Sequence, residues 1–470
     1  MPPGGRTWDP NTGTWWSETP YTRAPRRHKQ SGGNSGCAVL FVIVLGFLVL
    51  GSVVSSGSQS TSNAYPYDTP YVVFGDFNAE VAGKPIAMAT AAAQDLPSAT
   101  FPARDPLVAS GGLSQARADH TATLLRDGRV VVAGGRSAPN SPSAVALIET
   151  YDPKTRSFAP TGLLLTARSG HTATLLKDGT VLFAGGTGSD GEALASAEIY
   201  NPKTGKSYPT GGMAVARVSG TAMALDDGTV LMVGGTDGNP VWSTEIYDPS
   251  SGVFKELDHV LVNQGITTAV KLKDGRVLVA GGDISGPWSN AIEIYGPTGS
   301  IDIAAGIEPR DDATSCLLAD GRAMIVGGLG NSEQINTTAE LLDPQGLPAI
   351  SLISLGAPRW HNTTTALPDG SALIVGGSND AGDPIATVER YYPGSPITTP
   401  VGTMAETRSE HTATLLADGS VLIAGGWSSS ATALSDAGLY FPNGAPTSSP
   451  SDSLTPTGGS PVAPAETVKP

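Results

Sequence analysis

Three arginine and histidine pairs are the residues of this chain whose types and spacing could carry chemistry. In each pair the histidine follows the arginine by three residues, and the pairs are Arg117 with His120, Arg168 with His171 and Arg408 with His411. If they met around one point, the imidazoles could bind a metal ion and the guanidiniums an anion. The alternative is that Arg-x-x-His belongs to a repeated structural motif, in which each histidine bonds its own loop. We treat the six as candidate binding residues and assign no catalytic residue, metal ligand or cofactor.

Three tryptophans in polar loops form a second set of candidate binding residues: Trp242, Trp288 and Trp427. A tryptophan can stack on a sugar ring or anchor a partner protein, because it combines a large apolar area with one hydrogen-bond donor. The surrounding loops are small, polar and mildly acidic, and none of them pairs a nucleophile with a base. The loops therefore favour binding over catalysis.

The arginine and histidine pairs lie in a cassette that occurs seven times along the chain. Each copy contains an Asp-Gly and, six residues after that glycine, a Gly-Gly pair. The pairs begin at Gly134, Gly185, Gly234, Gly281, Gly327, Gly376 and Gly425. A spacing that is kept through seven copies indicates a repeat architecture.

One copy predicts four short antiparallel strands. Asp127-Gly128 between two apolar runs is typical of a hairpin with a type I′ turn. The glycine pair at the end of the second strand suggests close approach of another backbone or an aromatic ring. The third strand reads Glu149-Thr-Tyr151-Asp-Pro, and a fourth follows with an aromatic residue such as Phe158. The repeated arginine and glutamate could pair within a blade or between neighbouring blades, and the sequence leaves this open.

These motifs resemble the kelch-repeat family, in the style of galactose oxidase, from about Leu107 to Pro442. The resemblance rests on the Gly-Gly pair, on Glu-x-Tyr-x-Pro and on the fourth-strand aromatic. It departs where Leu342 replaces the tyrosine and Gly438 replaces the last glutamate. The resemblance implies an all-β fold, a seven-bladed kelch-type β-propeller over residues 105–442.

The last copy of the repeat has only three strands. A segment upstream of the first copy, at about residues 107–111, lines up with the fourth strands of the other copies. We expect it to complete blade seven, because closure removes the exposed strand edges that invite pairing with other chains.

Outside the repeats, the sequence predicts a membrane anchor. Residues 1–36 are a basic segment, and residues 37–55 form an uncharged apolar run long enough for a transmembrane helix of about 27 Å. The basic flank predicts a cytoplasmic N-terminus and an extracytoplasmic propeller in a single-pass cell-membrane protein, with a cleaved signal peptide as the alternative. Residues 56–104 are expected to be a linker, and residues 443–470 a disordered tail rich in Pro, Ser and Thr.

Composition narrows the choice of partners. The formal net charge of −15 argues against a nucleic-acid partner, whose phosphates would require a basic surface. The two cysteines, Cys37 in the apolar run and Cys316 in a predicted strand, are not expected to pair, and Cys316 is expected to be a small buried residue. The oligomeric state is left open.

The favoured function is a membrane-tethered module that binds a protein or a cell-surface polysaccharide. The alternative is a galactose-oxidase-like or other carbohydrate-active enzyme at the cell surface. The resemblance implies that a copper radical oxidase would need a tyrosine cross-linked to cysteine and a Tyr-His pair. The chain contains no Tyr-His, and Trp360-His361 is the nearest approximation. Whether the protein is an enzyme is therefore left undecided, with binding preferred.

Overall fold

The computed structural model describes residues 6–9, 14–17, 107–139, 144–257, 265–282, 291–296, 301–305, 308–330, 334–344 and 350–444. Within these ranges no helix is long and apolar enough to cross a membrane. Residues 37–55, the predicted transmembrane helix, lie outside the described residues, and so do the predicted linker and nearly all of the predicted tail. A separate two-stranded antiparallel sheet joins β1 (Arg6–Asp9) to β2 (Thr14–Ser17).

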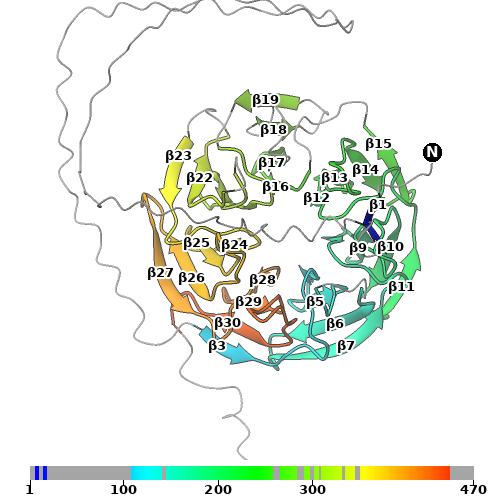
Figure 1. The fold of residues 1–470 in the computed structure, drawn as a ribbon, viewed down its shortest axis with the longest axis horizontal. Helices are drawn as coiled ribbons and strands as arrows, with labels where there is room; N and C mark the ends of the chain where they lie inside the picture. Colours follow the sequence, from blue (N-terminus) through cyan, green and yellow to red (C-terminus); the bar gives the residue numbers. More distant parts are fainter. Residues whose placement is uncertain are drawn as a thin grey trace, which may run out of the picture. The chain divides into compact units, whose positions relative to one another are not determined.

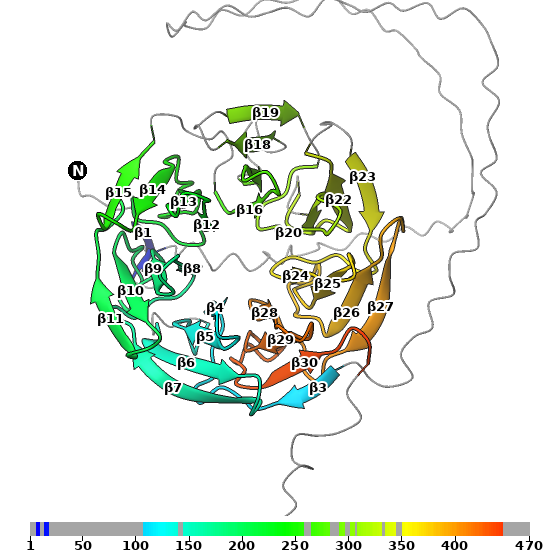
Figure 2. The same ribbon diagram turned by 180° about the vertical axis from the view of Figure 1, so that it is seen from behind.

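Seven four-stranded antiparallel sheets form the blades of a ring, as Figures 1 and 2 show from opposite sides. Blade 1 contains β4 (Thr121–Leu124), β5 (Val130–Ala133), β6 (Leu147–Asp152) and β7 (Ser157–Leu163); blade 2 contains β8 (Thr172–Leu175), β9 (Val181–Ala184), β10 (Ala197–Asn201) and β11 (Lys206–Pro209). Blade 3 contains β12 (Thr221–Ala224), β13 (Val230–Val233), β14 (Glu245–Asp248) and β15 (Val253–Glu256); blade 4 contains β16 (Thr267–Lys271), β17 (Val277–Gly281), β18 (Ala291–Tyr295) and β19 (Ile301–Ala305).

The remaining blades follow the same order of strands. Blade 5 contains β20 (Thr314–Leu317), β21 (Ala323–Val326), β22 (Thr338–Leu342) and β23 (Ile350–Ser354); blade 6 contains β24 (Thr363–Ala366), β25 (Ala372–Val375), β26 (Thr387–Tyr391) and β27 (Thr398–Thr403). Blade 7 contains β28 (Thr412–Leu415), β29 (Val421–Ala424), β30 (Ala437–Tyr440) and β3 (Leu107–Ser110). The seven-bladed all-β propeller predicted from the repeats is confirmed.

Blade 7 closes the ring with strands from both ends of the propeller. β3 pairs antiparallel with β30, and Leu107 lies opposite Tyr440. The first strands of neighbouring blades contact one another all the way around, including β28 with β4, so they line the central channel.

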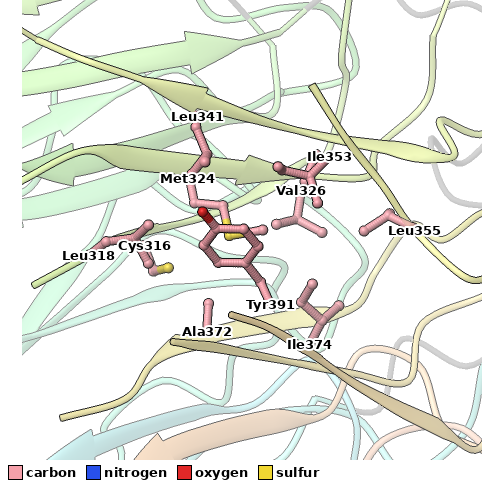
Figure 3. Close-up of a cluster of buried hydrophobic side chains, with 11 residues drawn as sticks. Cys316, Leu318, Met324, Val326, Leu341, Ile353, Leu355, Ala372, Ile374 and Tyr391 are labelled. Carbon is pink, nitrogen blue, oxygen red and sulfur yellow. The ribbon is translucent and has the colours of Figure 1, made fainter. Parts of the chain in front are cut away.

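The hydrophobic core lies between the blades. The second strands are almost wholly buried, as in β5, where all four residues are buried. Figure 3 shows the cluster between blades 5 and 6, where the ring of Tyr391 lies among Met324, Ile374 and Cys316. Cys316 is a small buried residue, as the sequence predicts, and burial raises the pKa of its thiol to about 12. Each buried aliphatic side chain stabilises the packing of blades by about 1.5–3 kcal/mol.

The hairpin turns differ from the predicted type I′. Gly128 has a φ of +88°, but Asp127 is not in the positive-φ region that a type I′ turn requires at both central positions. The amide of Gly128 donates to Leu125 O, and the amide of Leu125 donates to Arg129 O. This is a three-residue loop, a type I turn followed by a left-handed glycine. The side chain of Asp127 stabilises it by accepting from the Arg129 amide at 3.1 Å.

The two faces of the ring differ in what they carry. We call the side of the Asp-Gly turns the hairpin face. The opposite side, which we call the loop face, carries the glycine pairs, the loops between the second and third strands, and the segments that lead into the innermost strands. The segment Arg117 to His120 therefore lies on the loop face at the end of the channel.

Candidate functional site at the mouth of the channel

The repeated arginines form ion pairs within their own blades. Arg117 Nη2 lies 2.6 Å from Glu149 Oε2, and neither side chain is exposed. The same arginine also donates to Leu147 O at 2.8 Å. Equivalent pairs occur in blades 2, 3, 5 and 6: Arg168–Glu198, Arg217–Glu245, Arg310–Glu340 and Arg359–Glu389. In blade 7, which lacks the glutamate, Arg408 pairs with Asp436 at 2.6 Å. The pairing that the sequence left open is within a blade.

The three repeated histidines connect each blade to the one before it. His120 Nε2 lies 2.9 Å from Thr412 Oγ1. His171 makes the same contact with Thr121 at 2.9 Å, and His411 with Thr363 at 3.0 Å. Burial lowers the pKa of His120 to about 3, and burial likewise lowers the pKa values of the other two. These imidazoles are therefore neutral. Each one bonds a threonine of the neighbouring blade at the wall of the channel.

The glycine pair explains why the histidine fits. A Cβ on Gly425 would lie 2.5 Å from Arg117 O and 2.6 Å from Cε1 of His120. The amide of Gly426 donates to Arg117 O at 2.9 Å. Another backbone and an aromatic ring both approach the glycine, as its position at the end of a strand predicts.

The candidate tryptophans have different environments. Trp242 is 59% exposed on the loop face, where it is available for stacking. Trp427 is only 6% exposed, and its Nε1 donates to Glu410 Oε2 at 2.7 Å, so it supports another residue instead of facing solvent. Trp288 lies outside the described residues.

A cavity of about 230 Å³ opens at the loop-face end of the channel. Every blade contributes to it. Its lining consists of Asp119, His120, Gly170, His171, Ser219, Ile266, Asp312, Thr314, His361, Asn362, Glu410 and His411. We call this region the channel mouth.

One position in each copy provides most of the polar groups of the channel mouth. It is the residue immediately before the histidine position, and we call it the mouth position. From blade 1 to blade 7 the residues are Asp119, Gly170, Ser219, Ile266, Asp312, His361 and Glu410. Six of the seven have a φ between +51° and +59°, a region that disfavours residues other than glycine, asparagine and aspartate.

Backbone hydrogen bonds hold the mouth positions to one another. The amide of Asp119 donates to Glu410 O at 3.2 Å, and the amide of Gly170 donates to Asp119 O at 2.9 Å. The amide of Ser219 donates to Gly170 O at 2.8 Å. The left-handed conformation is thus part of a blade-to-blade backbone connection.

Charged side chains join four consecutive blades at the channel mouth. His361 Nε2 lies 2.5 Å from Asp312 Oδ2, and its Nδ1 lies 3.3 Å from Glu410 Oε1. Arg136 pairs with Asp119 and lies 3.3 Å from Glu410 Oε2. The guanidinium of Arg136 also lies 5.4 Å from the centre of the Trp427 ring. The result is a chain of ion pairs through blades 5, 6, 7 and 1.

The pKa values follow from this arrangement. Burial alone would lower the pKa of His361, but the carboxylates of Asp312 and Glu410 raise it to about 9. Burial would raise the pKa of Glu410, but His361, Asp119 and Arg136 lower it to about 2. Burial and the neighbouring Glu410 raise the pKa of Asp119, against the opposite influence of Arg136. At neutral pH His361 and Glu410 are therefore charged.

The channel mouth has two unlike halves. We call Asp312, His361, Glu410 and Asp119, on blades 5, 6, 7 and 1, the charged half. The uncharged half consists of Gly170, Ser219 and Ile266, on blades 2, 3 and 4. The charged half presents carboxylates that accept hydrogen bonds, while the uncharged half adds backbone and apolar surface. Such a pocket can orient a polar ligand from one side.

Sequence reasoning missed the mouth position because it searched for residues that recur. Among copies that agree on the hairpin and the glycine pair, this position changes from Asp to Gly, Ser, Ile, Asp, His and Glu. That variation inside a constant motif is a signal that was available in the sequence. Trp360-His361 stands out in the sequence only as the nearest approximation to a Tyr-His pair.

Comparison with solved structures supports the fold. The chain is similar to a structure described as a novel fungal alcohol oxidase with catalytic diversity among the AA5 family, in complex with copper. The TM-score is 0.57 and the sequence identity 21%, over 73% of this chain and 76% of that one. The structure of YjhT is also similar, with a TM-score of 0.47 and 14% identity over 62% of this chain and 99% of that one. No protein-family model and no curated protein matches the sequence. At 21% identity the similarity to the alcohol oxidase structure concerns the fold alone, and activity has to be argued from the site.

The described residues do not fit a copper site of the kind that the oxidase resemblance implies. No group of three histidine, cysteine, aspartate or glutamate side chains among them is arranged to hold a metal ion. Cys316 lies near Tyr391, but both are in an apolar cluster between blades, in which Tyr391 is the repeat tyrosine of blade 6. The charged half of the channel mouth consists of groups that bond one another.

Proposed function

We propose that the protein is a membrane-tethered, extracytoplasmic propeller of the kelch type that binds a protein or a cell-surface polysaccharide at its loop face. The channel mouth is the proposed ligand site. The observation that carries this proposal is the mouth position, where side chains vary from blade to blade on a nearly constant backbone and line a cavity.

The seven copies serve as an internal comparison. Arg–Glu pairs recur in blades 1, 2, 3, 5 and 6, where they are buried, and the glycine pairs recur in every copy because a neighbouring backbone approaches them; both belong to the packing of the blades. The mouth position recurs only in backbone conformation. Asp312, His361 and Glu410 occupy a φ region that costs about 1–2 kcal/mol for a residue with a side chain. Polar residues kept at such a cost are typical of functional sites.

The chemistry of the channel mouth suits reversible binding. Its carboxylates and imidazole can hydrogen bond to hydroxyl, amide or ammonium groups, which both polysaccharides and proteins present. Trp242 adds an exposed aromatic surface on the same face. The membrane tether and the extracytoplasmic location rest on the sequence of residues 1–55.

Affinity capture from an envelope extract tests the proposal. The full-length protein, solubilised in detergent, is compared with Glu410→Gln, which removes one channel-mouth charge, and with Asp226→Asn, which changes an exposed acid elsewhere in the propeller. We expect one protein or glycan to be retained by the wild type and by Asp226→Asn, and to be lost with Glu410→Gln. Equal capture by all three proteins would contradict a site at the channel mouth.

Two further measurements address the tether and the enzyme alternative. A reporter fused to the C-terminus should be active only outside the cytoplasm, and activity only inside would overturn the proposed topology. Stoichiometric copper in the purified protein, with hydrogen peroxide formed from alcohols or aldehydes, would overturn the binding proposal in favour of an oxidase.

A further inference from the structure

His361 bridges three consecutive blades. It occupies the mouth position of blade 6, and its two ring nitrogens face carboxylates at the mouth positions of blades 5 and 7. Nε2 lies 2.5 Å from Asp312 Oδ2, and Nδ1 lies 3.3 Å from Glu410 Oε1. The ring also stacks on Trp360, with the ring centres 3.9 Å apart and the planes at 22°.

A carboxylate oxygen beside each ring nitrogen favours the imidazolium form. A neutral imidazole has one N–H donor and one nitrogen lone pair, whereas the protonated ring donates from both nitrogens. If the ring were neutral, a lone pair would face one of the two carboxylates and repel it. The neighbouring carboxylates, acting against burial, raise the pKa of His361 to about 9, which agrees with the contacts.

Glu410 connects His361 to the other charged groups of the channel mouth. Its Oε2 accepts from Trp427 Nε1 at 2.7 Å and lies 3.3 Å from Arg136, which also pairs with Asp119 of blade 1. The remaining polar neighbours of His361 are uncharged: Asn362, whose amide donates to Thr314 Oγ1, and the neutral His411. When His361 loses its proton, the cation between Asp312 and Glu410 is lost, and Arg136 is the remaining cation beside Glu410.

We propose that His361 is a protonation-dependent clasp, which joins blades 5, 6 and 7 at the channel mouth while it is charged and releases them when it becomes neutral. The clasp would control the width of the cavity. As regulation of a ligand site it rests on the proposed function, but the clasp itself is measured without any ligand.

The uncharged half provides an internal control. Both halves have backbone hydrogen bonds between mouth positions, such as Ser219 N to Gly170 O at 2.8 Å and Glu410 N to His361 O at 3.2 Å. Gly170 and Ser219, however, carry no ionisable side chain. A change in the protonation of His361 should therefore act on blades 5 to 7 and leave the mouth positions of blades 2 and 3 unchanged.

Nuclear magnetic resonance of the full-length protein with ¹³C-labelled histidine measures the protonation directly. We expect one imidazole signal to titrate above pH 8 and to be missing in His361→Asn, a variant whose new residue tolerates positive φ. The buried His120, His171 and His411 should not titrate between pH 5 and 10. A His361 signal that titrates below pH 7 would overturn the proposal.

Hydrogen exchange measures the clasp. At pH 7 we expect His361→Asn to increase exchange at the amides of Asp312 and Glu410 at least tenfold, with no change at Gly170 and Ser219. The control variant His171→Asn changes a histidine outside the clasp and should leave Asp312 and Glu410 protected. Should His361→Asn fail to fold, the wild type at pH 10, corrected for intrinsic exchange, should show the same local increase.

Unchanged exchange, or an equal increase on all blades, would exclude the clasp. Because no ligand is present in these measurements, failure of ligand capture with an intact clasp would reject the proposed function alone.

Discussion

The two halves of the channel mouth have nearly the same backbone and very different side chains. Ser219 and His361 have φ values of +54° and +51°, yet one carries a small hydroxyl and the other bridges two carboxylates. The blades below them are alike, with the same buried ion pairs and glycine contacts. The comparison shows that the repeated residues build the blades, while the side chain at the mouth position differs between copies and determines the chemistry of the site.

Shared architecture predicts equal losses in both halves when a buried ion pair is broken. Arg168→Met in blade 2 and Arg359→Met in blade 6 each leave a buried glutamate without its partner. We expect each variant to lose about 3–5 kcal/mol of unfolding free energy, measured by urea denaturation. A difference between the two of more than about 2 kcal/mol would show that the halves are not built alike.

The glycine pairs allow a second test of the shared architecture. Gly185→Ala and Gly425→Ala both place a Cβ 2.5 Å from the carbonyl oxygen of a neighbouring arginine, at φ values of +68° and +62°. We expect each to lose about 2–4 kcal/mol, because overpacking adds to the left-handed strain. The measurement is the denaturation midpoint, and a neutral effect in either half would contradict the predicted contact.

The pH dependence of stability should separate the two halves. The pKa of His361 is raised in the folded state from the ordinary value of 6.5 to about 9, so its contribution is complete below pH 6.5 and disappears as the pH rises through 9. We expect the wild type to lose about 1–3 kcal/mol over this range and His361→Asn to lose less. Thermal unfolding at pH 6, 8 and 10 compares them, and parallel curves would contradict the charge of His361.

The smallest effect is expected in the uncharged half. Ser219→Gly keeps the positive φ and removes a small side chain, so relief of strain and the greater freedom of the unfolded chain nearly offset each other. We expect a change in unfolding free energy of less than about 1 kcal/mol and no effect on ligand capture. A loss of capture would show that the uncharged half also contacts the ligand.

Most of the fold could be predicted from the sequence because the same strand and turn motif occurs in seven copies. The hairpins, the seven blades and the fit of a backbone against the glycine pair follow from residues that recur at fixed spacing. The turn type could not be predicted reliably, since Asp-Gly suits both a type I′ turn and the three-residue loop around Gly128. The partner of Arg117 was also undetermined, because the same glutamate recurs in six of the seven copies.

The candidate site was harder to predict because its residues do not recur. Asp312, His361 and Glu410 are far apart in the sequence, and only the side-by-side packing of consecutive blades brings them together. Trp427 shows a related difficulty. A tryptophan in a polar loop suggests an exposed anchor, but here the ring is buried and its N–H bonds to Glu410.

The pairing of Leu107 with Tyr440 places the first and last strands of the described propeller side by side. The polypeptide enters and leaves at neighbouring points of blade 7, and Arg390 donates to Pro442 O while pairing with the hairpin residue Asp369, which places that exit on the hairpin face. The described propeller therefore begins and ends on the side of the ring opposite the channel mouth, so a domain joined directly to either end starts away from the cavity.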